Sequence, residues 1–161
     1  TEVAHRAWQY VSMDFIPALP TPTTGLDAIL VVVCMLSKMV HLIPTTVEIT
    51  AKGLAELYRD HVWKLHGIPE KLISDRGPQF IAVFTQALTK ALQIQQGLAT
   101  AAHPQTDGQT ERTHRTIEQI LRGFVYNQHN DWLHALPLAE FCYNNSVHSS
   151  TKFSPLIKLT L

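Results

Sequence analysis

The spacing of hydrophobic and polar residues predicts strands in the first part of the chain. Residues 8–16 alternate between apolar and polar positions, with Asp14 on the more polar face, as expected for a strand. Residues 26–36 form a continuous run rich in β-branched residues, which is typical of a strand buried on both faces. Residues 38–44 follow after a tight connection and predict a third strand. We therefore expect the chain to begin with an antiparallel meander.

After residue 50 the spacing becomes that of helices, interrupted by short strands. The helical segments are 50–67, 78–92, 108–126 and 131–145. Thr50 suits the N-terminal cap of the first helix and Gly67 its C-terminal cap, and Pro137 is expected to divide the last helix into two pieces. Short strands are predicted at 70–74 and, weakly, at 93–99. The order β-β-β-α-β-α-β-α-α predicts a mixed α/β domain.

Length and composition indicate a single globular domain over residues 1–161. Hydrophobic residues make up 45% of the chain and charged residues 16%, which argues against disorder. Lys and Arg together number 13, as do Asp and Glu, so the net charge of zero gives no indication of a nucleic-acid partner. The longest apolar run, residues 28–36, is too short to cross a bilayer, and no signal peptide is evident.

The cysteines and histidines do not form a metal-binding pattern. Cys34 and Cys142 each lie in an apolar segment, and no C-x-x-C pair occurs, so we expect two buried free thiols in a reducing compartment. The nine histidines are scattered, with no H-E-x-x-H and no cysteine partners at zinc spacing.

Three acidic residues are candidates for chemistry, although each has a simpler explanation when considered alone. Asp14 lies in a strand among apolar neighbours, and could be an edge residue facing water. Asp75 follows a short apolar strand, where ligand sites gather in α/β sheets, and could instead cap the next helix. Glu111 lies at the start of the helix 108–126, where it would favour the helix dipole and pair with Arg115.

The combination of the three acids favours a metal site. Two carboxylates associated with strands and one at a helix start can converge at one edge of a sheet. Hard oxygen ligands without a thiolate or paired histidines suit Mg²⁺ or Mn²⁺ and not zinc. Such a cluster can hold two ions, one activating a water or 3′ hydroxyl and the other stabilising the leaving oxygen of a phosphodiester displacement.

At these residues the chain resembles the integrase core of gypsy-type LTR retrotransposons, relatives of retroviral integrases. The resemblance lies in "VSMDFI", "DAILVVV", "LSKMVHLIP", "LHGIPEKLISDRGPQF", "HPQTDGQTERTHRTIEQILR", "DWLHALPLAEFCYNNSVHSST" and "SP", spread over nearly the whole chain. Thirty-five residues, 76–110, separate Asp75 from Glu111, as in the D,D-35-E signature of that family.

The resemblance implies a ribonuclease-H-like fold, with a five-stranded mixed sheet flanked by helices, and Asp14, Asp75 and Glu111 as a metal-binding catalytic triad. It implies a polynucleotidyl transferase that processes the 3′ ends of element DNA and then joins them to target DNA. It also implies a homodimeric core cut from a longer polyprotein, with a zinc-binding domain before it and a basic domain after it. The expected location is the nucleus, after a virus-like particle in the cytoplasm.

The polar stretch "HPQTDGQT", residues 103–110, then corresponds to a DNA-facing loop over the metal ions. Without the resemblance, a merely solvated loop would be the first interpretation. Arg76 is a weaker candidate, since a surface arginine is more often simply solvated. The residues implied as DNA contacts are His103, Gln105, Thr106, Gly108, Arg115 and Arg122.

Two alternatives remain open from the sequence. One is another ribonuclease-H-like nuclease, although such enzymes usually add a fourth acid, which has no evident place here. The other is a domesticated integrase core retained as an interaction module, against which the intact triad argues. Because the net charge is zero, we expect much of the DNA affinity to lie outside these 161 residues.

Overall fold

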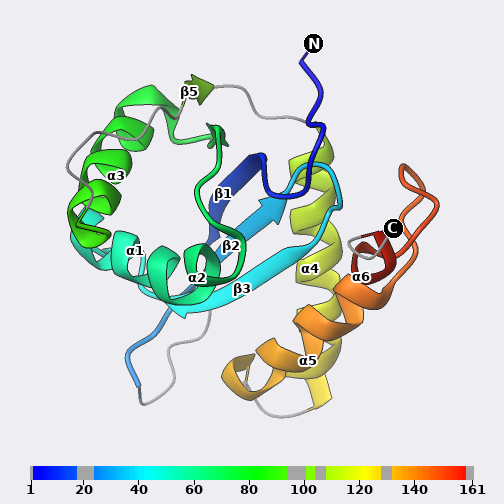
Figure 1. The fold of residues 1–161 in the computed structure, drawn as a ribbon. Coiled ribbons are helices and arrows are strands. Elements are labelled where there is room, and N and C mark those ends of the chain that lie inside the picture. The colour runs from blue at the N-terminus through cyan, green and yellow to red at the C-terminus, as the bar shows by residue number, and fades with distance from the viewer. Residues whose placement is uncertain (1, 18–23, 94–100, 104–107, 128–131, 159–161) are drawn as a thin grey trace.

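A mixed sheet with helices on both faces forms the protein (Figure 1). The computed structural model describes residues 2–17, 24–93, 101–103, 108–127 and 132–158, except for the side chains of residues 101–103, 108–111, 114, 124–127 and 158. The strands are β1 Tyr10–Ile16, β2 Ala28–Cys34, β3 Val40–Thr45, β4 Lys71–Ile73 and β5 Ala101–His103. The helices are α1 Ala51–Tyr58, the π-helical turn Arg59–Trp63, α2 Lys64–His66, α3 Gly77–Ala91, α4 Gly108–Asn127, α5 Trp132–Asn145 and α6 Pro155–Lys158.

The sheet combines the predicted antiparallel meander with parallel strands. Its order is β3-β2-β1-β4-β5, in which β1 pairs with β2 antiparallel and with β4 parallel. All seven residues of β2 are buried, which explains their continuous apolar character. The predicted mixed α/β architecture is therefore confirmed.

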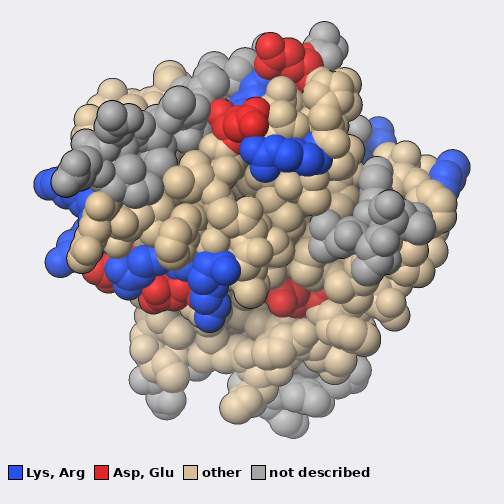
Figure 2. All heavy atoms as spheres, viewed as in Figure 1, with Lys and Arg blue, Asp and Glu red and all other residues tan. Residues whose placement is uncertain are grey.

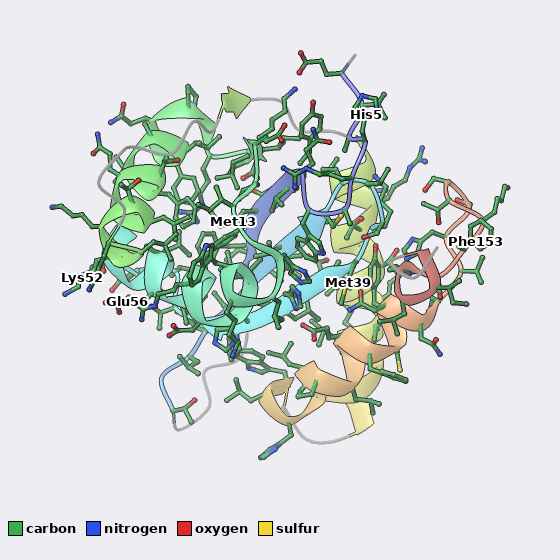
Figure 3. The ribbon with its side chains drawn as sticks, in the orientation of Figure 1. His5, Met13, Met39, Lys52, Glu56 and Phe153 are labelled. Atoms are coloured by element: carbon green, nitrogen blue, oxygen red, sulfur yellow. The ribbon has the colours of Figure 1, made fainter. Side chains whose placement is uncertain are left out.

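Two hydrophobic cores lie on opposite faces of the sheet. Met13, labelled near the centre of Figure 3, shares one core with Leu54 of α1 and Phe84 of α3. Ile117 of α4 and Trp132 of α5 share the other core with alternate residues of β2 and β3. In Figure 1, α1, α2 and α3 accordingly lie to one side of the sheet, and α4 and α5 to the other.

The predicted ends of the first helix are confirmed. The Thr50 Oγ1 atom accepts a hydrogen bond of 3.1 Å from the Gly53 amide, as an N-terminal cap does. The helix ends at Gly67, whose φ of 77° lies in the left-handed region that glycine tolerates best. Between these ends the chain is continuous through α1, the π-helical turn and α2.

Both cysteines are free thiols, with Cys34 buried and Cys142 only partly buried.

One sequence prediction about an element was wrong. Helix α5 is one continuous helix with Pro137 inside it, not two pieces. Pro137 lies on the exposed side, while Trp132, Leu136 and Tyr143 on the opposite side are anchored in the core, so packing outweighs the lost hydrogen bond. The strand predicted at 93–99 lies, apart from residue 93, outside the described residues, and the structure shows a fifth strand, β5, at Ala101–His103.

Candidate active site

The parallel pairing of β1 with β4 brings two of the predicted acids to the same level of the sheet. Ser12 of β1 lies opposite Ile73 of β4. Asp14 and Asp75 each lie two residues further along the chain, so both lie just beyond the last residues that pair these parallel strands, Asp14 in the carboxyl-terminal half of β1 and Asp75 after β4. This is the edge at which ligand sites gather in open α/β sheets.

Hydrogen bonds tie the two acids together. The backbone amide of Asp75 donates to the Asp14 Oδ1 atom at 3.1 Å, and the Ser74 hydroxyl donates to the same oxygen at 3.0 Å. Asp14 is only 3% exposed, whereas Asp75 is exposed to solvent. The simpler explanation of Asp14 as an edge residue facing water is therefore wrong. Two donors fix the orientation of its carboxyl group.

Burial, and after it the neighbouring Asp75 carboxyl, raise the pKa of the Asp14 carboxyl to about 8. The amide of Asp75 and the hydroxyl of Ser74 oppose this effect because they stabilise the ionised form. The two carboxyls thus share a site in which both cannot easily be negative without a nearby positive charge. Strongly perturbed acids of this kind are concentrated at functional sites.

Arg76, directly after Asp75, is held over two aromatic rings. The centre of its guanidinium group lies 4.4 Å from the centroid of the Phe15 ring and 5.6 Å from that of Phe80. These residues also line a small hollow of about 160 Å³ between the end of β1 and α3. Because aromatic faces attract cations, Arg76 is ordered beside the acid pair and is more than a solvated surface arginine.

The third predicted acid, Glu111, lies in the first turn of α4, but its side chain is outside the described atoms. Its convergence with Asp14 and Asp75 therefore stays a prediction. Among the side chains that the structure describes, no group of three His, Cys, Asp or Glu residues could hold a metal ion. The described acid site is accordingly the pair of Asp14 and Asp75.

The expected loop 103–110 is shorter than predicted. His103 belongs to β5, and Gly108 begins α4, because the strand and the helix extend into the polar stretch from both sides. Gln105 and Thr106 lie outside the described residues. Arg115 and Arg122 are exposed on α4, as a DNA contact requires.

Sequence reasoning missed the role of Ser74. Its side chain is fully buried, and besides donating to Asp14 its hydroxyl accepts a hydrogen bond of 3.2 Å from the Arg76 amide. The available signal was a polar residue at the end of an apolar strand, directly before a candidate acid.

In the described part of the chain, no helix is long and apolar enough to cross a membrane.

Comparison with known proteins gives this site a family context. Residues 4–104 match the family described as integrase core domain. The chain is 36% identical over 152 residues, 94% of its length, to the Transposon Tf2-3 polyprotein of Schizosaccharomyces pombe, of which it spans only 11%.

Solved structures share the fold. The HTLV-2 integrase catalytic core domain in complex with magnesium, in a trimeric form, is 18% identical with a TM-score of 0.68, over 93% of this chain and 95% of that one. A chain of the simian T-cell lymphotropic virus intasome, in complex with the B56 gamma regulatory subunit of PP2A, is 17% identical with a TM-score of 0.70, over 96% of this chain and 56% of that one. With the family match covering more than half of its residues, the chain belongs to the integrase core domain family.

Proposed function

We propose that this chain is the catalytic core of a gypsy-type LTR retrotransposon integrase of the D,D-35-E type. In this proposal it processes the 3′ ends of element DNA and joins them to target DNA in the nucleus, as a divalent-metal-dependent polynucleotidyl transferase. The observation that carries the proposal is the buried Asp14 carboxyl, which accepts a hydrogen bond from the backbone amide of Asp75 where two parallel strands lie side by side. Membership of the integrase core domain family supports the same reaction class.

The acid pair fits a divalent cation. Carboxylate oxygens are the ligands that Mg²⁺ and Mn²⁺ prefer. A cation between Asp14 and Asp75 would offset the burial and the repulsion by Asp75 that together raise the pKa of Asp14 to about 8. The related HTLV-2 core was solved in complex with magnesium. We assign Asp14 and Asp75 as ligands, with Glu111 as the third, and expect two ions.

The residues of the chain prepare the site in three ways. Ser74 and the Asp75 amide orient the Asp14 carboxylate and favour its ionised form. Asp14 would hold a cation as an ionised carboxylate, so cation binding would be linked to loss of its proton. When bound, the ions supply stabilisation of negative charge on the attacking and leaving oxygens of an in-line displacement at phosphorus. Glu111, at the start of α4, completes the set of carboxylates in this proposal.

Partners follow from the same assignment. The HTLV-2 core is described in trimeric and dimeric forms, and we propose a homodimeric core for this chain.

The proposed DNA partners are the element ends and the target, contacted by Arg115 and Arg122 on α4 and by the loop residues His103, Gln105, Thr106 and Gly108. On the face shown in Figure 2, Lys and Arg over α1 and α2 lie beside Asp and Glu and form no continuous basic surface. Additional DNA affinity is therefore assigned to segments outside these residues.

The test is the reverse joining reaction, called disintegration, on a branched DNA that mimics the strand-transfer product. The 161-residue chain should resolve this DNA with Mg²⁺ or Mn²⁺, and Glu111→Gln, which keeps size but removes charge, should lower the rate at least 100-fold. Arg59→Gln, far along the chain on the π-helical turn, is the matched surface control and should leave the rate unchanged. Equal rates for the native chain and Glu111→Gln, or no reaction with either metal, would argue instead for a nuclease of another type or a domesticated module.

A further inference from the structure

A cluster of three rings joins the segment before β1, strand β3 and helix α2 at the amino end of β1, whereas Asp14 lies in the carboxyl-terminal half of that strand. The Trp8 ring stacks on the His66 ring with centroids 3.8 Å apart and on the His41 ring with centroids 5.2 Å apart. The Nε2 atoms of the two histidines lie 2.8 Å from each other. These histidines are 25 positions apart in the chain, so no spacing in the sequence indicates their contact.

A carboxylate orients the His41 ring. His41 is only 8% exposed, and its Nδ1 atom lies 3.6 Å from the Oε1 atom of Glu140 on α5. The same oxygen accepts a hydrogen bond of 2.7 Å from the Leu42 amide, which fixes the carboxylate. A carboxylate beside Nδ1 favours a proton on that nitrogen and leaves the lone pair of Nε2 on the side of His66. Histidines that bind metals almost always have such a partner on their second ring nitrogen.

The helix that carries His66 directs it toward β3 (Figure 1). The π-helical turn Arg59–Trp63 directly precedes α2, and one extra residue in a helix turns the residues after it by about 100° around the helix axis. Burial, and after it the His41 imidazole, lower the pKa of the His66 imidazole to about 4. At neutral pH the ring is therefore uncharged, which is the form that binds metal ions. His66 is only partly buried, so solvent reaches it.

Trp8 forms the wall of the cluster. Its φ of 62° lies in the left-handed region, which is uncommon for a residue other than glycine. The side chain is 4% exposed, and in the described part of the chain its indole N–H has no hydrogen-bond partner. A buried donor without an acceptor is unfavourable and calls for an explanation, such as a bound ion or water. A water molecule on a metal ion at the two imidazoles is an acceptor of the kind that this donor lacks.

We propose that His41 and His66 bind a divalent transition-metal ion, Cu²⁺ or Ni²⁺, through their Nε2 atoms, with solvent in the remaining positions. The ion takes the place of the proton between the two nitrogens, and this proton is released to solvent. Glu140 lies on the other ring nitrogen of His41, so it orients the ligand and is not itself one. Among the described residues no third His, Cys, Asp or Glu joins the pair.

The distance between the two nitrogens favours these ions over zinc. Bonds from a metal ion to imidazole are about 2.0–2.1 Å long, so nitrogens 2.8 Å apart subtend an angle of about 90° at the ion. This is the angle between neighbouring ligands in the square-planar or tetragonal coordination that Cu²⁺ and Ni²⁺ prefer. A tetrahedral zinc ion would hold the nitrogens about 3.3 Å apart. Imidazole ligands also separate this site from the acid pair, whose carboxylates suit Mg²⁺, so the proposal does not depend on the integrase reaction.

The Trp8 ring gives the test a local readout, because Cu²⁺ quenches the fluorescence of an indole ring at short range. The 161-residue chain is titrated with Cu²⁺ at neutral pH while its tryptophan fluorescence is recorded. The variant His66→Gln removes one ligand but keeps an N–H donor for the Nε2 atom of His41, so it should stay folded. The matched control is His61→Gln, which removes an exposed histidine from the π-helical turn of the same helix.

We expect quenching of the native chain and of His61→Gln to saturate with one bound ion. Mutation of even an outer-shell partner lowers metal affinity roughly 10–100-fold, so the loss of a direct ligand should weaken Cu²⁺ binding by more than about ten-fold in His66→Gln. Trp8→Phe, which keeps a ring in the stack, should lose most of the quenching. Equal Cu²⁺ affinity of His66→Gln and the native chain, or full quenching in Trp8→Phe, would overturn the proposal.

Two further measurements separate this site from the acid pair. Ni²⁺ should raise the Tm of the native chain and of His61→Gln, but not that of His66→Gln, because an ion that binds only the folded chain stabilises it. Excess Mg²⁺ should leave the Cu²⁺ titration unchanged, because imidazole nitrogens do not suit Mg²⁺. Displacement of Cu²⁺ by Mg²⁺ would place the ion at the carboxylates of the acid pair and would overturn the histidine site.

Discussion

Replacing Asp14 by Asn should change how the stability of the metal-free protein depends on pH. Asp14 is 3% exposed, and its pKa is raised from 3.8 to about 8 by burial and by the neighbouring Asp75 carboxyl. Between these two pH values the unfolded chain has lost the proton that the folded chain still holds. Stability therefore decreases as the pH rises from about 4 to about 8, since unfolding releases a proton.

The magnitude follows from proton linkage. Each pH unit in this window changes the free energy of unfolding by about 1.4 kcal/mol for one proton. Between pH 5 and pH 7 the native chain should therefore lose roughly 3 kcal/mol of stability through Asp14, a loss that Asp14→Asn lacks. All other titrating groups are common to the two proteins, so the difference between them isolates this contribution.

The assay is urea unfolding of both proteins in EDTA at pH 5, 6 and 7, followed by circular dichroism. The stability of Asp14→Asn relative to the native chain should increase steadily over this range. Adding Mg²⁺ to the native chain should stabilise it more at pH 8 than at pH 5, because the cation binds the ionised carboxylates. A stability difference that stays constant from pH 5 to pH 7 would refute the raised pKa and the buried environment behind it.

Two further predictions concern single side chains. Ser74→Ala removes a hydrogen-bond donor that favours the ionised form of Asp14. A hydrogen bond to a charged group contributes about 1.5 kcal/mol, so the pH profile of disintegration should shift upward by roughly one pH unit. An unshifted profile would contradict this positioning role of Ser74. The Asn144 side chain accepts a hydrogen bond from the Val40 amide at 2.8 Å and donates one to the Val40 carbonyl at 3.0 Å. Asn144→Ala should therefore lower the free energy of unfolding, measured in urea, by roughly 2–4 kcal/mol. The exposed neighbour Asn145→Ala is the control, and equal losses for both variants would show that the edge of β3 does not depend on this contact.

The sequence predicted those features that depend on neighbouring residues. The alternating residues before Asp14 and the buried run of β2 defined the meander, because their spacing reflects the faces they bury. Thr50 and Gly67 defined the first helix because each end needs specific local hydrogen bonds or dihedral angles. Asp14 and Asp75 were identified as candidates because Asp14 lies within an apolar strand and Asp75 comes just after one.

Features that depend on contacts between distant segments could not be predicted. The burial of Asp14 arises when β4 pairs beside β1, some 60 residues later in the chain, and brings Ser74 with it. One hollow is lined by Lys38 in the turn after β2, by residues of α4 and by the segment after α5, and no local pattern links these three segments. The continuity of α5 through Pro137 likewise depends on the core beneath it and not on its own sequence.

The most direct test of the central claim is a crystal structure of the chain grown with Mn²⁺, in which anomalous scattering locates the ions. The account predicts at least one strong Mn²⁺ peak bound by the carboxylates of Asp14 and Asp75, with Glu111 as a further ligand, and its loss in Asp75→Asn. A well-ordered site without Mn²⁺, or a Glu111 carboxylate that points away from the acid pair, would contradict the assignment of these three residues as one metal-binding catalytic site.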